Sequence, residues 1–260
     1  MKDIKNNTLE RRRKILTMLE ETNQVVVHEL SNKFSVSEVT IRNDLDQLER
    51  KNMLIKVRGG AIKMASGVSI DKNLSEKNKL HYQEKAQIGK KAASLINESE
   101  TILIDSGTTT MQVARNLNGL KDITILTSAL NIANYLVGIP DINVIVIGGY
   151  LRKKSYSMIG PIAEKSLKNF FVDKLFIGVD GFDIRGGGIY TPMIEEAHLN
   201  KVMIDIAQEV IVVADSSKFY RRSFAFICGA DKIDMVITDK GLMKEDKERL
   251  EKLGVETIIV

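Results

Sequence analysis

The feature that most constrains the fold of this 260-residue chain is an alternation of apolar, strand-like runs with helical patterns. The runs are rich in Val and Ile and cover residues 101–105, 123–127, 142–147, 174–179, 209–214, 235–238 and 256–260. Helical patterns lie between most of them, at residues 111–117, 130–137, 162–170, 194–207 and 242–253. Because near-continuous apolar strands must be buried on both faces, the alternation predicts an α/β fold with a doubly wound, mostly parallel sheet.

The loops that follow the strands are the first candidates for a site, because ligands of such sheets bind beyond the carboxyl ends of the strands. The first loop opens a helix and consists of Asp105, Ser106, Gly107, Thr108, Thr109 and Thr110. Its backbone N–H groups, its hydroxyls and the helix dipole would attract a phosphate. Plain capping explains one Ser or Thr, but four hydroxyls beside a glycine favour phosphate binding. The spacing matches neither a Walker A loop nor a dinucleotide fingerprint.

The other strand ends also present polar groups or glycines. They place five further candidates near the same edge of the sheet: Ser128, Gly149, Arg152, Asp180 and Lys218. A single Asp at a strand end is commonly a cap or turn residue. The set as a whole supplies carboxylates for sugar hydroxyls and a lysine for phosphate, and it therefore predicts a site for a phosphorylated sugar.

The first quarter of the chain carries all of the excess positive charge. Residues 1–63 hold 13 Lys and Arg against 9 Asp and Glu, whereas the rest holds 25 of each. Such a distribution is typical of polyanion binding at one end, although a solvated charge run gives the same count. Arg11, Arg12 and Arg13 crowd the first turns of a helix predicted over residues 8–21. This position is unfavourable against the helix dipole, and a DNA phosphate could offset it.

Two more predicted helices complete a helix-turn-helix: a short one over residues 28–34 and a third that reaches residue 51. Ser37 is a suitable N-cap for the third helix. At about 100° per residue, Ile41, Leu45 and Leu48 form its buried face. The third helix is therefore the candidate for insertion into the major groove.

The outer face of this third helix is short, polar and almost uncharged. It consists of Val39, Thr40, Asn43 and Gln47, with Arg42 on the flank. Asn and Gln can bind adenine bidentately, and Val and Thr can contact thymine methyl groups. A merely solvated face would more often carry Lys and Glu, so the pattern favours base reading.

Two short strand-like runs around Gly59 and Gly60 predict a hairpin within residues 54–63. A wing of this kind would place Lys56 and Arg58 near phosphates or the minor groove of double-stranded DNA. The predicted domains are a winged helix-turn-helix in residues 1–65, a linker in residues 66–82 and a sugar-phosphate-sensing α/β domain in residues 83–260.

The composition indicates a cytoplasmic protein that needs no cofactor or metal. Cys228 is the only cysteine, so no internal disulfide can form. The polar start lacks the apolar core of a signal peptide, and the longest apolar runs are far shorter than the roughly 20 residues of a membrane helix. Glu195 and His198 have a ligand-like spacing, but no second cluster completes a metal site.

Several of these motifs resemble the DeoR family of bacterial transcription regulators. The resemblance lies in residues 36–37, 40–45, 48–49 and 58–61, and again in residues 105–110, 148–149, 157–160 and 215–218. It implies a sensor similar in fold to ribose-5-phosphate isomerases and glucosamine-6-phosphate deaminases. It also implies that residues 105–110 form the phosphate-side loop and that Lys218 resembles a lysine of an isomerase loop.

Other positions resemble the branch of N-acetylgalactosamine-utilisation repressors. Asn43 stands where many family members carry a second Arg, so no operator sequence carries over, and residues 178–183 and 195–200 resemble the branch. The branch implies galactosamine-6-phosphate or a tagatose phosphate as effector, and we count Glu196 among the effector-binding residues. A homodimer or homotetramer would place two recognition helices on the half-sites of an operator.

An enzyme is the alternative class, because the implied fold is shared with sugar-phosphate isomerases. An acid–base pair could come from Asp105, Asp180, Asp183, Glu195, Glu196 and Asp215. The complete helix-turn-helix, which an isomerase does not need, favours a regulator of a sugar or amino-sugar catabolic operon. The residues themselves do not decide between a repressor and an activator.

Overall fold

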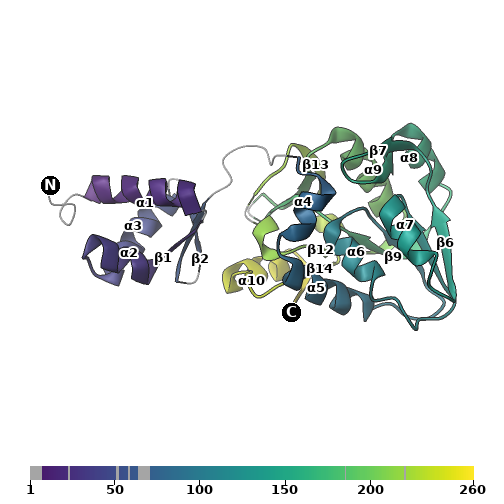
Figure 1. The fold of residues 1–260 in the computed structure, drawn as a ribbon, viewed down its shortest axis with the longest axis horizontal. Helices are drawn as coiled ribbons and strands as arrows, with labels where there is room; N and C mark the ends of the chain where they lie inside the picture. Colours follow the sequence, from purple (N-terminus) through teal and green to yellow (C-terminus); the bar gives the residue numbers. More distant parts are fainter. Residues whose placement is uncertain are drawn as a thin grey trace. The chain divides into compact units, whose positions relative to one another are not determined.

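The computed structural model describes residues 8–22, 24–50, 53–57, 59–63, 71–184, 186–219 and 221–260 (Figure 1). The chain divides into two compact units, residues 1–66 and residues 67–260. Among these described residues, the smaller unit has one hydrophobic core and the larger unit has two.

The smaller unit is built on the helices α1 (Thr8–Thr22), α2 (Val27–Phe34) and α3 (Glu38–Arg50). The hydroxyl oxygen of Ser37 caps α3 by accepting a hydrogen bond from the backbone N–H of Thr40 at 3.2 Å. Ile15, Leu30 and Ile41, one from each helix, are fully buried in the shared core. The predicted helix-turn-helix layout is therefore confirmed.

A three-stranded antiparallel sheet in the order β1-β3-β2 completes this unit. The strands are β1 (Gln24–Val26), β2 (Leu54–Val57) and β3 (Gly60–Lys63). The hairpin of β2 and β3 was predicted, but β1 was not, because three residues are too few to show a strand pattern. Gly60 is required where β1 meets β3, since a Cβ there would lie 2.0 Å from the carbonyl oxygen of Val25.

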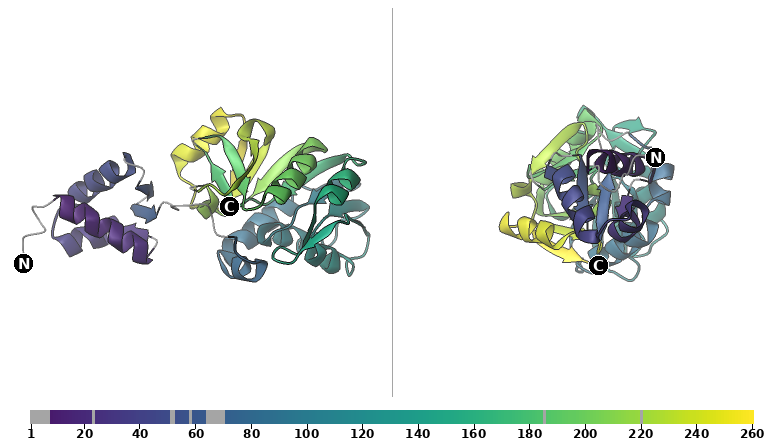
Figure 2. Two further views of the ribbon diagram at one scale, coloured as in Figure 1. Left: turned by 90° about the horizontal axis from the view of Figure 1, so that it is seen from above. Right: turned by 90° about the vertical axis from the view of Figure 1, so that its left-hand side faces the viewer.

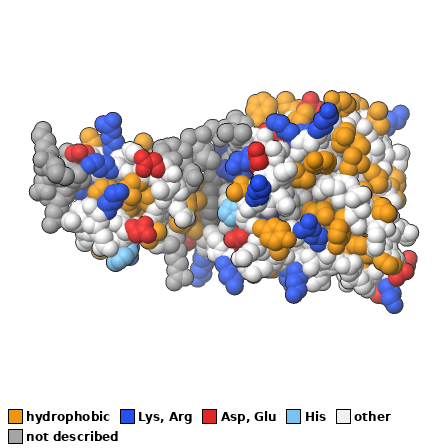
Figure 3. All heavy atoms as spheres, viewed as in Figure 1, with side chains coloured by type: hydrophobic (Ala, Val, Ile, Leu, Met, Phe, Trp, Pro, Cys, Tyr) orange, Lys and Arg blue, Asp and Glu red, His pale blue; other side chains and the backbone are white. Residues whose placement is uncertain are grey.

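Two arginines near the start of α1 are paired within the protein. Arg11 donates from Nε to Oδ2 of Asp44 at 2.5 Å, and Arg12 donates from Nε to Oδ1 at 2.7 Å. Arg11 and Asp44 are both buried. The expectation that a DNA phosphate offsets these charges is wrong for this pair, because a carboxylate of α3 does so. On the visible face of this unit, Lys and Arg lie among Asp and Glu (Figure 3).

The larger unit contains a seven-stranded sheet in the order β15-β14-β12-β9-β4-β5-β6. All of its pairings are parallel. The strands are β4 (Thr101–Ile104), β5 (Ile123–Thr127), β6 (Ile142–Val146), β9 (Val172–Ile177), β12 (Ala207–Val213), β14 (Met235–Thr238) and β15 (Glu256–Ile259). Each corresponds to one strand-like run of the sequence, and the predicted parallel sheet is confirmed.

Helices cover both faces of this sheet (Figures 1 and 2). One face packs against α5 (Tyr82–Ala93), α6 (Thr108–Ala114) and α7 (Leu130–Leu136). The other packs against α8 (Pro161–Leu167), α9 (Ile194–Asp205) and α10 (Lys244–Lys252). Because successive strand residues point to opposite faces, Phe176 belongs to the first core and its neighbours Leu175 and Ile177 to the second.

The strand order changes direction next to β4. The chain runs from β4 through β5 to β6 on one side, whereas β9, β12, β14 and β15 follow on the other. The loops after β4 and β9 therefore lead away from each other. Folds of this type bind their ligands in the crevice that such a reversal leaves at the carboxyl ends of the strands.

Short elements outside the main sheet were not predicted. The hairpin of β7 (Tyr150–Arg152) and β8 (Ser157–Ile159) is one, and β10 (Gly181–Asp183), β11 (Gly188–Thr191) and β13 (Ala225–Gly229) form another small sheet. The remaining short helices are α4 (Leu74–Lys79), η1 (Ser216–Lys218) and η2 (Ala230–Lys232). Helix α4 lies within residues 66–82, the predicted linker, and this segment contacts the larger unit from Asp71 onward.

Candidate functional site

A cavity opens where the strand order reverses. Its empty space is about 680 Å³, which includes the part that is open to solvent. The lining comes mainly from the loops after β4 and β9, the β7–β8 hairpin, α4, α9 and η1. Its polar side chains are Lys77, Asp105, Ser106, Thr108, Thr109, Arg152, Ser155, Ser157, Asp180, Thr191, Glu196, Asn200 and Lys218. This lining suits a polar ligand.

Asp105 is a buried carboxylic acid in the wall of the cavity. The backbone N–H groups of Ser106 and Gly178 and the side chain of Asn200 act to lower the pKa of its carboxyl group. Burial, together with the nearby carboxylate of Glu196, nevertheless raises the pKa of Asp105 to about 7. Near neutral pH the group can therefore act as a hydrogen-bond donor or as an acceptor toward a ligand.

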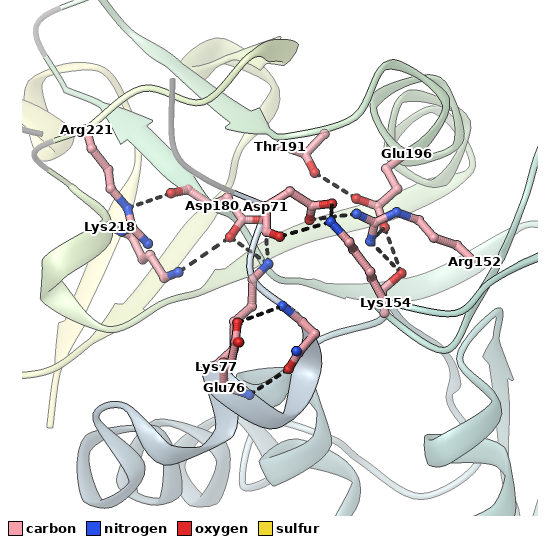
Figure 4. Close-up of polar contacts among 12 residues, drawn as sticks. Asp71, Glu76, Lys77, Arg152, Lys154, Asp180, Thr191, Glu196, Lys218 and Arg221 are labelled. Atoms are coloured by element: carbon pink, nitrogen blue, oxygen red, sulfur yellow. Dashed lines mark hydrogen bonds and ion pairs between the residues drawn. The ribbon is translucent and has the colours of Figure 1, made fainter. Parts of the chain in front are cut away.

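A second carboxylate, Asp180, lies among basic side chains (Figure 4). Oδ1 of Asp180 lies 2.8 Å from Nζ of Lys77 and 3.6 Å from Nζ of Lys218. Arg221 donates from Nε to the backbone carbonyl of Asp180 at 2.8 Å. Burial acts to raise the pKa of Asp180, but Lys77, Lys218 and Arg221 outweigh it, and the pKa lies below its ordinary value. One ionised carboxylate thus faces three cations.

Lys218 reaches the cavity from η1, which follows β12. Asp215 caps η1 by accepting a hydrogen bond from the backbone N–H of Ser217 at 3.2 Å, and this fixes the lysine backbone. Burial lowers the pKa of Lys218 to about 8, although Asp180 acts in the opposite direction. At neutral pH most of the lysine is still protonated and would attract an anionic group.

Arg152, from β7, holds a second network of charges (Figure 4). Its Nη1 donates to Oε1 of Glu196 at 2.9 Å and to Oγ of Ser155 at 2.7 Å, and its Nη2 donates to Oδ1 of Asp71 at 2.7 Å. Thr191 donates from Oγ1 to Oε2 of Glu196 at 3.1 Å. The cavity therefore carries an arginine–carboxylate network beside the lysine cluster.

Most residues that were predicted to bind an effector line this cavity. They are Asp105, Ser106, Gly107, Thr108, Thr109, Arg152, Asp180, Glu196 and Lys218. Thr110, Ser128 and Gly149 do not: the first two are fully buried elsewhere. A Cβ at Gly149 would lie 2.8 Å from the carbonyl oxygen of Ile159, so this glycine permits close packing against β8.

Other lining residues were missed by sequence reasoning: Leu74, Lys77, Ser155, Ser157, Thr191 and Asn200. Leu74 and Lys77 belong to the polar segment that reads as a linker, and nothing in that segment indicates where it folds. Ser155 and Ser157 belong to the β7–β8 hairpin, which was not predicted either. Asn200 follows Glu196 by four residues on α9 and lies in residues 195–200, which resemble the family branch, but it was not assigned to the site.

Helix α3 presents its predicted outer face to solvent. Val39, Arg42 and Asn43 are exposed, and Thr40 and Gln47 are half-buried. The opposite face is buried, as predicted: Ile41, Leu45 and Leu48. Two of the predicted cations are paired within the unit. Arg42 donates from Nη2 to Oε2 of Glu38 at 2.6 Å, and Lys56 pairs with Asp46. Arg58 lies outside the described residues.

Three other features would point to different chemistry: a metal site, a membrane-spanning helix and an acid–base pair formed by Asp183, Glu195 or Asp215. No group of three or more His, Cys, Asp or Glu is placed there to hold a metal ion, and none of the helices described could cross a membrane by its length and apolarity. Asp183, Glu195 and Asp215, which were considered for an acid–base pair, do not line the cavity. Asp183 pairs with Arg222, Glu195 is exposed and Asp215 caps η1.

A helix-turn-helix with a β-hairpin wing, followed by a parallel α/β unit with a polar cavity, defines a DNA-binding transcription regulator. Comparison with known families agrees: a DeoR-like helix-turn-helix domain matches residues 11–66, and a DeoR C terminal sensor domain matches residues 80–240. The chain belongs to the DeoR family. This assignment places it among transcription regulators rather than among isomerases.

Individual relatives match nearly the whole chain. It is 39% identical over 254 residues to a putative aga operon transcriptional repressor of Escherichia coli O157:H7, which covers 97% of this chain and 94% of the relative. It is 33% identical over 245 residues to the transcriptional repressor GlcR of Bacillus subtilis, covering 94% and 93%.

Two solved structures show weaker similarity. The full-length sorbitol operon regulator SorC of Klebsiella pneumoniae has a TM-score of 0.43 at 10% identity, covering 92% of this chain and 98% of that one. Ribose 5 phosphate isomerase A of Neisseria gonorrhoeae has a TM-score of 0.39 at 17% identity, covering 53% of each chain.

Proposed function

We propose that this regulator represses a sugar or amino-sugar catabolic operon and is released from its operator by a phosphorylated sugar. The observation that carries the proposal is the cavity, where Lys77, Lys218 and Arg152 lie among carboxylates and hydroxyls. A phosphorylated sugar has both an anion and several hydroxyls to match them. The relative named for the aga operon supports galactosamine-6-phosphate or a tagatose phosphate as the effector.

The two ends of such a ligand would bind different parts of the lining. The phosphate would bind Lys218 and the hydroxyls of Ser106 and Thr108, in the loop after β4, because charge-assisted hydrogen bonds are the stronger kind. The sugar hydroxyls, and an amino group where one is present, would bind Asp105 and Glu196, which can accept hydrogen bonds from them.

The DNA-reading surface in this proposal is the outer face of α3. Asn43 and Gln47 would read adenine, and Val39 and Thr40 would contact thymine methyl groups. The backbone phosphates would be contacted by Ser37, Arg42, Lys56 and Arg58, and Arg42 and Lys56 would exchange their carboxylate partners for phosphates. A cytoplasmic homodimer or homotetramer would present two such helices to half-sites one or more helical turns apart.

Two titrations test the proposal. Fluorescence anisotropy compares DNA from upstream of the gene with a random duplex at one salt concentration, because both affinities depend on salt. Calorimetry compares galactosamine-6-phosphate and tagatose-6-phosphate with unphosphorylated galactosamine. We expect the upstream DNA and a phosphorylated sugar to bind preferentially. Equal binding of both duplexes, or no binding of either sugar phosphate, would contradict the proposal.

The direction of control needs a separate measurement. Transcription from the adjacent promoter should rise when the gene for this regulator is deleted. A fall in transcription would instead identify an activator, and it would leave DNA binding and effector binding as proposed.

A further inference from the structure

The segment of residues 71–80, here named the strap, is bound at both of its ends to the rest of the larger unit. It contains α4, which has a complete capping box formed by Asn73 and Glu76. In the sequence it follows residues 64–70, which link the smaller unit, here also called the DNA-reading unit, to the strap of the larger unit. Whatever fixes or frees the strap therefore acts directly on the end of this connection.

The N-terminal end of the strap is bound through Asp71. Its Oδ1 accepts a hydrogen bond from Nη2 of Arg152 at 2.7 Å, and its Oδ2 lies 3.1 Å from Nζ of Lys154. The backbone N–H of Leu74 donates to the carbonyl oxygen of Lys154 at 2.9 Å. Arg152 lines the cavity, so this end of the strap depends on a residue of the effector site.

The C-terminal end is bound through two lysines. Lys77 donates from Nζ to Oδ2 of Asp180 at 2.9 Å, within the cavity. Lys85, from α5, is buried and donates from Nζ to the backbone carbonyls of Lys77 and Leu80, both at 2.7 Å. Because buried backbone contacts hold this end, the ion pair of Asp71 is the more readily broken connection.

We propose that the Asp71–Arg152 ion pair is the switch that couples the cavity to the DNA-reading unit. The phosphate of the effector, bound by Lys218 and the loop after β4, adds negative charge to the cavity. It repels the Asp71 carboxylate from Arg152, and the N-terminal end of the strap is released. This inference rests on the proposed function, since it needs an anionic effector in the cavity. The Asp71–Arg152 contact would then be the means by which the effector in the cavity controls DNA binding.

Arg152 has two carboxylate partners, and their surroundings decide which one leaves. The side chain of Asp71 is 29% exposed and that of Glu196 is 12% exposed. Glu196 is also held by Thr191 and Ser155. A phosphate that enters the cavity repels both carboxylates, and Asp71 can move into solvent without leaving a buried charge behind.

The test compares Asp71→Asn with a matched control in the full-length chain. Asp71→Asn keeps the shape of the side chain and removes its charge. Glu76→Gln removes one charge from the same strap but preserves the capping box, in which Gln also serves, and Glu76 does not line the cavity. Asp71→Glu keeps the carboxylate, and wild-type behaviour of this variant shows that charge rather than misfolding causes the effect.

Two readouts are measured on each variant. Hydrogen exchange of the Leu74 amide reports release of the strap without any sugar, and anisotropy with the upstream DNA reports the effect on the DNA-reading unit. We expect Asp71→Asn to exchange faster at Leu74 and to bind DNA ~5-fold or more weakly. Glu76→Gln should match the wild type in both. Inorganic phosphate, used as the probe, should speed exchange in the wild type but add nothing in Asp71→Asn.

Wild-type exchange in Asp71→Asn, or faster exchange with unchanged DNA affinity, would overturn the inference. A failure of the proposed function looks different, because it appears in calorimetry of the wild type as absent binding of sugar phosphates. The exchange comparison between Asp71→Asn and Glu76→Gln needs no sugar, so the two failures are distinguishable.

Discussion

Burial moves the pKa values of two cavity side chains toward neutrality from opposite directions. It raises the pKa of Asp105 to about 7 and lowers that of Lys218 to about 8. Asp180, which is surrounded by cations, keeps a pKa below its ordinary value. Asp105 and Lys218 therefore change their charge near neutral pH, and each supplies a test.

Asp105→Asn should make the larger unit more stable at high pH than the wild type is. The folded-state pKa of Asp105 lies above the ordinary 3.8, so the wild type loses stability as pH rises from about 4 to about 7. Asn cannot ionise and escapes this loss. The difference in the free energy of unfolding should grow by an amount on the order of 2–4 kcal/mol over that window and level off above it. Denaturant unfolding from pH 5 to pH 8 measures it, and a difference that is independent of pH would contradict the account.

Lys218→Ala should weaken binding of the sugar phosphate by roughly 10- to 100-fold, because it removes a charge-assisted hydrogen bond. The upstream DNA should bind as tightly as before. Lys244→Ala removes an exposed lysine of α10 and serves as the control in the same calorimetric titration. Equal sugar affinity of Lys218→Ala and the control would remove Lys218 from the effector site.

At the level of elements, α1 and α3 are joined by a buried charge cluster as well as by their apolar faces. Arg11 and Arg12 both donate to Asp44 of α3. The cluster holds α3 against α1, and Asp44 is the chain neighbour of Asn43, the residue proposed to read adenine. A buried ion pair that loses one partner leaves an uncompensated charge in the core.

Asp44→Ala should destabilise the smaller unit by about 3–5 kcal/mol. Asp46→Ala, which removes a partly exposed partner of Lys56 from the same helix, should cost about 0–1 kcal/mol. Hydrogen exchange of the α3 amides, measured at increasing temperature, reports the stability of the smaller unit separately from that of the larger unit. Similar losses in both variants would show that the cluster does not stabilise the unit.

Asn43→Ala should lower affinity for the upstream DNA by about 1–3 kcal/mol and leave affinity for a random duplex nearly unchanged. Arg58→Ala should instead weaken both and reduce the dependence of affinity on salt by about one phosphate contact. Anisotropy at several salt concentrations separates the two variants. A loss of equal size on both duplexes for Asn43→Ala would exclude it from base reading.

Across the whole molecule, patterns that are continuous in the sequence were predictable, and contacts between distant segments were not. The buried strands of the parallel sheet are runs of β-branched residues, and the loop from Asp105 to Thr109 is one stretch. The strap was not recognised as part of the site, because Lys77 meets Asp180 across 103 residues and Asp71 meets Arg152 across 81. A polar segment carries no sign of such partners until the fold is known.

The same limit applies to the charges of the smaller unit. Three adjacent basic residues at the start of α1 read as a DNA contact, yet Arg11 and Arg12 neutralise a carboxylate of α3. Asp44 stands among the polar residues of α3, and only the packing of α1 on α3 makes it a buried partner. Sequence patterns predicted the helix-turn-helix and the buried face of α3, but not which cations pair with carboxylates within the unit.

If the cavity and α3 are coupled, the affinity of the regulator for DNA must depend on whether the cavity is occupied. The Kd for the upstream DNA is determined by anisotropy without ligand and then with the phosphorylated sugar that binds in calorimetry at saturating concentration. We expect a ~5- to 150-fold higher Kd with the sugar, and the same factor for the effect of DNA on sugar affinity. An unchanged Kd at saturation would contradict it.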